Sequence, residues 1–222
     1  LEAMTKKIND KTKIIYIANP DNPTGTYISI KEFDEFMINV PNRVLIILDE
    51  AYFEYAQFVK DYPDSMFYRY DNVITLRTFS KIYGLAGFRV GYGFAHSELI
   101  SNLLKVKLPF EPSSSAQIAA INALDDEKHL NDSINLNRYE MKKMKKLFDS
   151  HKVYYIDSVA NFLTIKLNNR DEVIKCTNFL LSRGVIVRDL IGFGLPKYIR
   201  ITVGNEEENN IFIKVFKEFI KK

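Results

Sequence analysis

A single cysteine, Cys176, excludes an internal disulfide framework, and the three histidines are isolated and lack the spacing of metal ligands. No apolar run approaches the roughly 18 residues that a membrane-spanning helix needs. The first residues also lack the charged start and long apolar segment of a signal peptide. These absences favour a cytoplasmic enzyme or binding protein without a metal site.

An excess of charge of one sign is absent as well. The net charge is +3, and the Lys and Arg residues are spread along the chain. In the densest basic stretch, residues 142–146, the lysines alternate with apolar residues, Met141, Met144 and Leu147. This spacing is typical of an amphipathic helix with one solvated face, so we expect neither a nucleic-acid partner nor a membrane partner.

The chain contains several short apolar runs, each bounded by polar, proline or glycine residues. Runs at residues 13–18, 44–48, 73–76 and 88–95 are typical of strands. Between the first two, Ser29 precedes an apolar pattern that includes Ile30 and Phe33, which predicts a capped helix. Nearly all-apolar strands are expected in a sheet covered on both faces, so the sequence predicts an α/β domain with a mostly parallel sheet.

The second half of the chain has a different character. A long helix is predicted from about Leu130 to Ser150. Short strands are then predicted at Tyr154 and at residues 162–165, 185–187 and 198–203, with helices at 172–181 and from Glu206 onward. We therefore expect a smaller C-terminal α+β domain and divide the chain into residues 1–135 and 136–222. The few strands before the long helix suggest the C-terminal part of a longer protein.

Polar groups follow three predicted strands at their carboxyl ends, where ligands gather in open α/β sheets. Asn19-Pro-Asp-Asn-Pro-Thr-Gly25 follows the first strand, Asp49 closes the second, and Thr78-Phe-Ser-Lys81 follows the third. A partly desolvated carboxylate needs a cation or a strong donor, and Lys81 is a suitable partner. Spacing alone leaves two interpretations open: a structural Asp–Lys pair beside a turn, or a ligand site.

The order of the motifs favours the ligand site. Asn-Pro-x-Asn-Pro-Thr-Gly, Asp49-Glu-Ala-Tyr52, Ser80-Lys81 and Leu85-Ala-Gly-Phe-Arg-Val-Gly91 follow one another along the chain. With this set the chain resembles the fold-type I pyridoxal-phosphate (PLP) aminotransferases, and within them the histidinol-phosphate aminotransferases, from about Ile14 to Lys222. The resemblance implies a PLP-binding large domain whose N-terminal part is missing from this sequence.

The resemblance implies roles for individual residues. Lys81 would hold PLP covalently and move the proton, and Asp49 would keep the pyridine nitrogen protonated. Asn22 and Tyr52 match donors to the cofactor's 3′-oxygen, and Tyr52 joins Asp49 and Lys81 as a catalytic residue. Glu50 and Glu54 are spaced as on a solvent-exposed helix face, so we leave both out of the site.

The phosphate of PLP needs hydroxyls and a permanent cation. Thr78, Ser80 and Arg89 match the family's phosphate contacts, and the arginine fork suits two phosphate oxygens. Gly84, Gly87 and Gly91 either form turns or allow a close approach of the backbone near the cofactor, and we favour the close approach.

Two arginines of the small domain stand out. Arg188 follows the run 185–187 and Arg200 lies inside the run 198–203, where a charge is expensive unless it meets an anion. One interpretation is a pair of outward-facing arginines on a half-exposed strand. The resemblance implies instead a clamp for the substrate phosphate, with Asn161 at another substrate-side position.

The resemblance implies a homodimeric enzyme of histidine biosynthesis that transfers an amino group between L-histidinol phosphate and 2-oxoglutarate. Alternatives are a threonine-phosphate decarboxylase or an aromatic-amino-acid aminotransferase of the same subgroup, or a non-catalytic domain that senses PLP. In relatives the N-terminal region supplies a phosphate-binding loop and a ring that stacks on the pyridine. Without that region, residues 1–222 are expected to bind PLP weakly or not at all.

Overall fold

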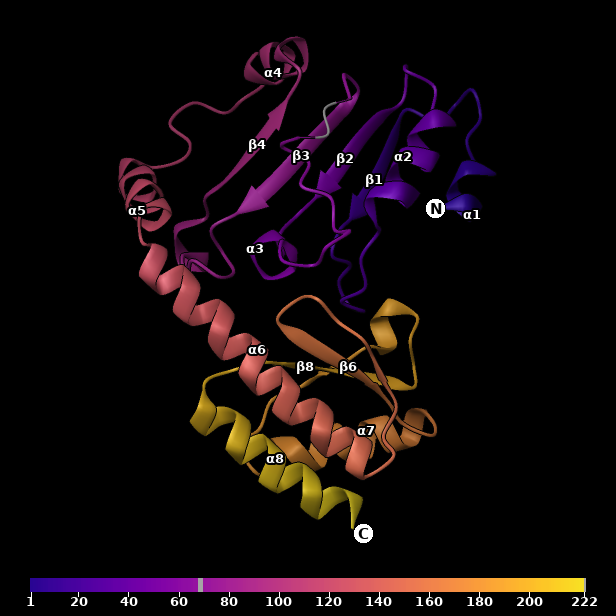
Figure 1. Cartoon of the computed structure of the whole chain (residues 1–222), viewed down its shortest axis with the longest axis vertical. Helices are drawn as coiled ribbons and strands as arrows, with labels where there is room; N and C mark the ends of the chain where they lie inside the picture. The colour runs from indigo at the N-terminus through magenta and orange to yellow at the C-terminus, as the bar shows by residue number, and fades with distance from the viewer. Residues whose placement is uncertain (68–69, 222) are drawn as a thin grey trace. The chain divides into compact units, whose positions relative to one another are not determined.

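The computed structural model describes residues 1–67 and 70–221, which form two compact units (Figure 1). The first unit comprises Leu1–Asp21 and Tyr27–Leu130, and the second comprises Asn22–Thr26 and the chain from Asn131 onward. The division predicted from the sequence, after residue 135, lies a few residues further along the same helix. The short segment Asn22–Thr26, which sequence reasoning keeps with the first unit, belongs to the second.

The first unit is built on one four-stranded sheet in the order β1-β2-β3-β4 (Figure 1). Its strands are β1 (Ile14–Ala18), β2 (Leu45–Asp49), β3 (Val73–Thr78) and β4 (Gly91–Ala95). The first three pair in parallel, whereas β4 runs antiparallel to β3. The prediction of a mostly parallel sheet in an α/β fold is confirmed.

Apolar side chains hold the sheet and its helices together. The helices of this unit are α1 (Glu2–Thr5), α2 (Ile30–Ile38), α3 (Phe53–Ala56), η1 (Ala86–Phe88), α4 (Ser97–Leu104) and α5 (Ser114–Leu124). Ser29 caps α2 through a reciprocal bond with Glu32, so the predicted cap is confirmed. Phe33 and Phe36 of α2 are 2% exposed and pack on the sheet, which contributes about 1.5–3 kcal/mol for each ring.

The second unit is a smaller α+β arrangement, as predicted. Its antiparallel sheet has the order β5-β6-β8-β7, with β5 (Tyr155–Ile156), β6 (Phe162–Lys166), β7 (Arg188–Asp189) and β8 (Tyr198–Thr202). The helices are α6 (Glu127–Ser150), which begins in the first unit, α7 (Arg170–Leu181), η2 (Ile191–Phe193) and α8 (Glu206–Ile220). Met141, Met144 and Leu147 of α6 enter the core while Lys142 and Lys146 are exposed, which confirms the amphipathic helix.

Two predicted strands differ from the observed ones. Residues 185–187 form no strand, because Gly184 turns the chain with a φ of 78° and the Val185 amide donates back to Leu180 of α7. The predicted strand 88–95 begins only at Gly91, since Ala86–Phe88 form a short 3₁₀ turn. In both places local turn geometry overrides an apolar pattern that suits a strand.

Gly91 and Gly25 are required by close contacts. A Cβ atom at Gly91 would lie 2.7 Å from the carbonyl oxygen of Arg77 on the neighbouring strand. A Cβ atom at Gly25, which has a φ of 77°, would overlap Ser158 Oγ. The close approach at Gly91 is therefore to the backbone of β3.

Among the helices of the described residues, none is long and apolar enough to cross a membrane.

Candidate active site

Asp49 stands at the carboxyl end of β2 and is held from two sides. The Tyr16 hydroxyl donates a hydrogen bond to Asp49 Oδ2, and Oδ1 accepts from the Ala51 amide at 3.0 Å. Burial raises the pKa of Tyr16, and the hydrogen bond to Asp49 and its negative charge raise it further. Tyr16 therefore remains a neutral donor that orients this carboxylate.

Lys81 lies at the same edge of the sheet as Asp49, because it follows the carboxyl end of the adjacent parallel strand β3. Its Nζ is 5.1 Å from the ring centroid of Tyr52, which is buried and precedes α3. The Lys81 carbonyl accepts from the Gly84 amide at 2.9 Å, which closes a turn around the lysine. The Lys81 side chain itself is exposed and available to a ligand.

Thr78, Ser80 and Arg89 flank the turn that joins β3 to β4. Thr78 pairs with Gly91, and Thr78 Oγ1 accepts from the Ser80 amide at 3.1 Å. Arg89 has a left-handed backbone with φ of 51°, a conformation that costs a residue other than glycine roughly 1–2 kcal/mol. Its Nη1 donates to the Ala86 carbonyl at 2.9 Å, and the side chain is exposed. The sequence thus keeps a guanidinium where glycine would be less strained.

The donor set at this edge fits PLP. An oriented carboxylate suits a protonated ring nitrogen, an amine suits the aldehyde, and hydroxyls with a guanidinium suit a phosphate. The first unit brings six of the residues predicted from the sequence to the carboxyl edge of its sheet or the turn beyond it: Asp49, Tyr52, Thr78, Ser80, Lys81 and Arg89.

The second unit brings its two predicted arginines directly opposite each other. Arg188 of β7 and Arg200 of β8 are cross-strand partners, so both side chains leave the same face of the sheet. Arg200 Nη1 donates to Asn22 Oδ1, and its Cζ lies 5.0 Å from the Phe162 ring centroid. Arg200 Nε is buried without a hydrogen-bond partner among the described residues. Two like charges placed opposite each other repel, so this pair is suited to an anion.

Asn22 and Asn161 also belong to the second unit. Asn22 therefore lies in a different unit from Asp49 and Tyr52, although the sequence predicts one cofactor site for all three. Asn161 precedes β6, and its carbonyl accepts from the Val203 amide at 2.8 Å, which fixes its backbone beside β8.

Three charged residues that sequence reasoning missed are buried beneath the carboxyl edge of the first sheet. Glu50 and Glu54 are 0% and 3% exposed, so their assignment to a solvent-exposed helix face was wrong. The helix α3 is only one turn long and packs inward, and Glu50 meets the buried Arg77 of β3. A signal was present in the sequence, since Arg77 follows the apolar run 73–76 much as Arg188 follows its own run.

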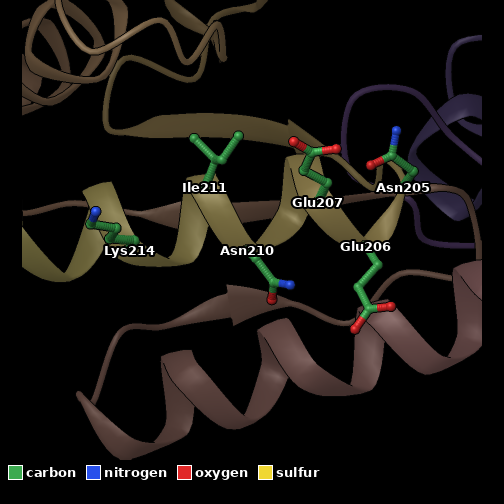
Figure 2. A pocket seen from close by; sticks show the side chains of 6 residues that line it. All are labelled: Asn205, Glu206, Glu207, Asn210, Ile211 and Lys214. Carbon is green, nitrogen blue, oxygen red and sulfur yellow. The ribbon is translucent and has the colours of Figure 1, made fainter.

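The described part of the second unit also holds a shallow cavity of about 610 Å³ (Figure 2). Asn205, Glu206, Glu207, Asn210, Ile211 and Lys214 line it. All six come from α8 and its cap, and Figure 2 shows their side chains fanning out around a single helix. None of the predicted site residues lines this cavity.

The sequence matches a known protein family and named relatives. The family "Aminotransferase class I and II" matches residues 1–216. Histidinol-phosphate aminotransferase 1 of Nitrosococcus oceani is 44% identical over all of this chain, and histidinol-phosphate aminotransferase 2 of Carboxydothermus hydrogenoformans is 43% identical over 98% of it. The chain spans about 60% of the length of each of these relatives.

Solved structures share the fold. Histidinol-phosphate aminotransferase from Sinorhizobium meliloti, in complex with pyridoxal-5′-phosphate, matches with a TM-score of 0.86 and 27% identity over 94% of this chain and 57% of that one. The histidinol-phosphate aminotransferase from Clostridium acetobutylicum matches with a TM-score of 0.89 and 24% identity over 99% of this chain and 67% of that one.

Proposed function

Because the chain belongs to the class I and II aminotransferase family, we propose that the whole protein is a PLP-dependent enzyme that transfers an amino group between L-histidinol phosphate and 2-oxoglutarate. The reaction is a step of histidine biosynthesis. The proposal also places the enzyme in the cytoplasm. The observation that carries it is the position of Asp49 and Lys81 at one edge of the sheet.

PLP, when bound, supplies an electron sink for bonds at the substrate carbon. In this proposal the chain's own residues bind and orient that group. Lys81 attaches it and moves a proton with its amine, and Asp49 holds a proton on the ring nitrogen. Tyr52 and Asn22 donate to the 3′-oxygen, and the phosphate goes to the residues of the β3–β4 turn, Thr78, Ser80 and Arg89.

Arg188 and Arg200 would bind the anionic end of each substrate, with Asn161 nearby in the same unit. Histidinol phosphate offers a phosphate and no carboxylate, whereas glutamate offers a carboxylate at the same end. A pair of guanidiniums binds either anion, because their N–H groups donate hydrogen bonds to the oxygen atoms of a planar carboxylate or of a phosphate. This property supports one site that serves both half-reactions.

A homodimer is part of the proposal. Support comes from eight large apolar side chains that are exposed within residues 103–124 of the first unit. They are Leu103, Leu104, Val106, Leu108, Phe110, Ile118, Ile121 and Leu124. Exposed apolar surface of this extent is typical of an interaction site. Sedimentation should show a dimer that weakens on Ile118→Ser and persists on Ile174→Ser, a matched change at an exposed position of α7. A monomeric full-length protein would contradict this part.

The test of the activity uses the full-length protein with PLP. L-histidinol phosphate and 2-oxoglutarate should yield glutamate, and borohydride reduction should leave a pyridoxyl mass on the peptide that contains Lys81. Lys81→Ala should lose both signals. A wild-type protein that binds PLP but forms no glutamate with this amine would refute the substrate assignment.

One alternative uses the same residues. Threonine phosphate also carries a phosphate that the two arginines would bind, and its decarboxylation releases CO₂ and leaves the amine on the product. Release of CO₂ from threonine phosphate, without glutamate formation from histidinol phosphate, would favour this alternative.

A further inference from the structure

A buried ion pair ties together the carboxyl ends of β2 and β3. Arg77 Nε and Nη2 each lie 2.8 Å from Glu50 Oε2, and Nη2 lies 3.0 Å from Asp64 Oδ1. Glu50 is fully buried and Arg77 is 8% exposed. A guanidinium fork shared by two carboxylates fixes direction as well as distance, so this connection is stiffer than a single point contact.

Aromatic rings enclose the guanidinium. Arg77 Cζ lies 3.3 Å from the ring centroid of Phe53 on α3 and 5.3 Å from that of Phe94 on β4. Burial by itself would lower the pKa of Arg77, but the charge and the hydrogen bond of Glu50 raise it above the ordinary value. The cation is therefore retained, and it connects β2, β3, β4 and α3 at one point.

This connection lies next to the proposed cofactor residues but on the other face of the sheet. Asp49 pairs with Leu76, so the next residues along the two parallel strands are Glu50 and Arg77. Successive side chains of a strand point to opposite faces, which places Asp49 and Thr78 on one face and the ion pair on the other. The Glu50 amide donates to the Leu76 carbonyl at 2.9 Å, so the backbone pairing continues past Asp49.

We propose that the Arg77–Glu50 pair is a positioning device that sets the placement of Asp49 relative to the segment from Thr78 to Lys81. The inference rests on the proposed function, since it gives those residues their cofactor. Neither Arg77 nor Glu50 would touch the cofactor, because both point away from the face that bears Asp49. They act through the strand ends that carry the binding residues.

The consequence for the reaction follows from geometry. A misplacement of about 1 Å at a reacting group costs on the order of 10²-fold in rate. Lysine at position 77 would keep the charge but replace the fork by a single ammonium, which cannot hold Glu50 and Asp64 in fixed directions. Glutamine at position 50 would keep the shape of the side chain but remove its charge.

The experiment compares Arg77→Lys and Glu50→Gln in the full-length protein. The matched control is Arg43→Lys, an exposed arginine just before β2 that donates to the Thr12 and Asn9 carbonyls. The measurements are the dissociation constant of PLP, the pH midpoint of the visible absorption of bound PLP, kcat and KM, and the melting temperature. Both test variants should bind PLP more weakly, shift that pH midpoint and lose kcat on the order of 10²-fold, with KM near the wild-type value.

The measurements separate a positioning role from a purely structural one. Variants that melt at a lower temperature but keep the PLP affinity, pH midpoint and kcat of the wild type would overturn the inference, since the pair would then be only structural. A wild-type protein that binds no PLP would instead overturn the proposed function. If Arg77→Lys does not fold, Glu50→Gln and Asp64→Asn are judged by the same measurements, because each preserves the shape of the residue it replaces.

Discussion

Glu54 places a carboxyl group in the interior of the first unit, and its protonation should control the stability of that unit. The residue is 3% exposed, and its Oε2 atom has no hydrogen-bond partner among the described residues. Burial raises the pKa of Glu54 from 4.5 to about 7, Arg77 opposes this shift, and the negative charge of Glu50 adds to it. At neutral pH the folded protein therefore carries a carboxyl that is poised to lose its proton.

The magnitude and sign follow from the two protonation states. In the unfolded chain the carboxyl loses its proton near pH 4.5, whereas in the folded protein it keeps the proton up to about pH 7. Between these values the folded state binds more protons, so the free energy of unfolding falls as pH rises. At 1.36 kcal/mol per pH unit, the loss by pH 8 is roughly 3 kcal/mol. Glu54→Gln resembles the protonated residue in shape and cannot ionise, so it should escape this loss.

The assay is denaturant unfolding of the cofactor-free full-length protein from pH 4.5 to pH 8. Near pH 4.5 the Glu54→Gln variant and the wild type should have similar stability, and by pH 8 the variant should be more stable by roughly 3 kcal/mol. Glu207→Gln, at an exposed position on α8, is the control and should follow the wild-type curve. Parallel curves for Glu54→Gln and the wild type would refute the reasoning, because Glu54 would then titrate alike in both states.

Three further outcomes are expected. Asp49→Ala should leave some PLP bound but reduce kcat strongly, since the ring nitrogen loses its carboxylate; steady-state kinetics with unchanged kcat would contradict this role. Arg200→Ala should raise the KM for the phosphorylated substrate with less effect on PLP affinity, while the exposed Arg183→Ala serves as the control; equal KM values in both variants would make Arg200 structural. Gly91→Ala should lower the melting temperature, because its Cβ would lie 2.7 Å from the Arg77 carbonyl oxygen, and calorimetry with an unchanged midpoint would contradict that contact.

Most of the fold could be predicted from the sequence because the apolar pattern is locally consistent. The strand 44–48 is nearly all apolar and lies between β1 and β3, with Ile46 and Leu48 buried, and the cap at Ser29 is a local motif. The segment 185–187 was wrongly predicted to be a strand because its three residues are β-branched, which favours strands. Its backbone is bonded instead to Leu180 of the preceding helix, a contact that depends on the turn at Gly184.

The residues of the candidate site could be predicted from an ordered set of motifs. The buried charged residues beneath the site, Glu50, Glu54 and Arg77, could not. Glu50 and Glu54 looked solvent-exposed because helical spacing was assumed for a segment that forms a single turn. The buried Glu50 pairs with Arg77, which lies 27 residues away in the chain. Long-range ion pairs of this kind have no periodicity in the sequence, so only the pairing of β2 with β3 reveals them.

The segment Asn22–Thr26 has a consequence for the connectivity of the molecule. The polypeptide leaves the first unit after Asp21, returns at Tyr27 and leaves again after Leu130. Cleavage between residues 130 and 131 would therefore separate the second unit from its own segment Asn22–Thr26, which stays with the first piece. A recombinant fragment from residue 131 onward would leave the buried Thr164 hydroxyl without its acceptor, the Pro23 carbonyl, and the Val159 amide without the Gly25 carbonyl. The second unit is thus assembled from two distant stretches of chain and cannot be excised by truncation.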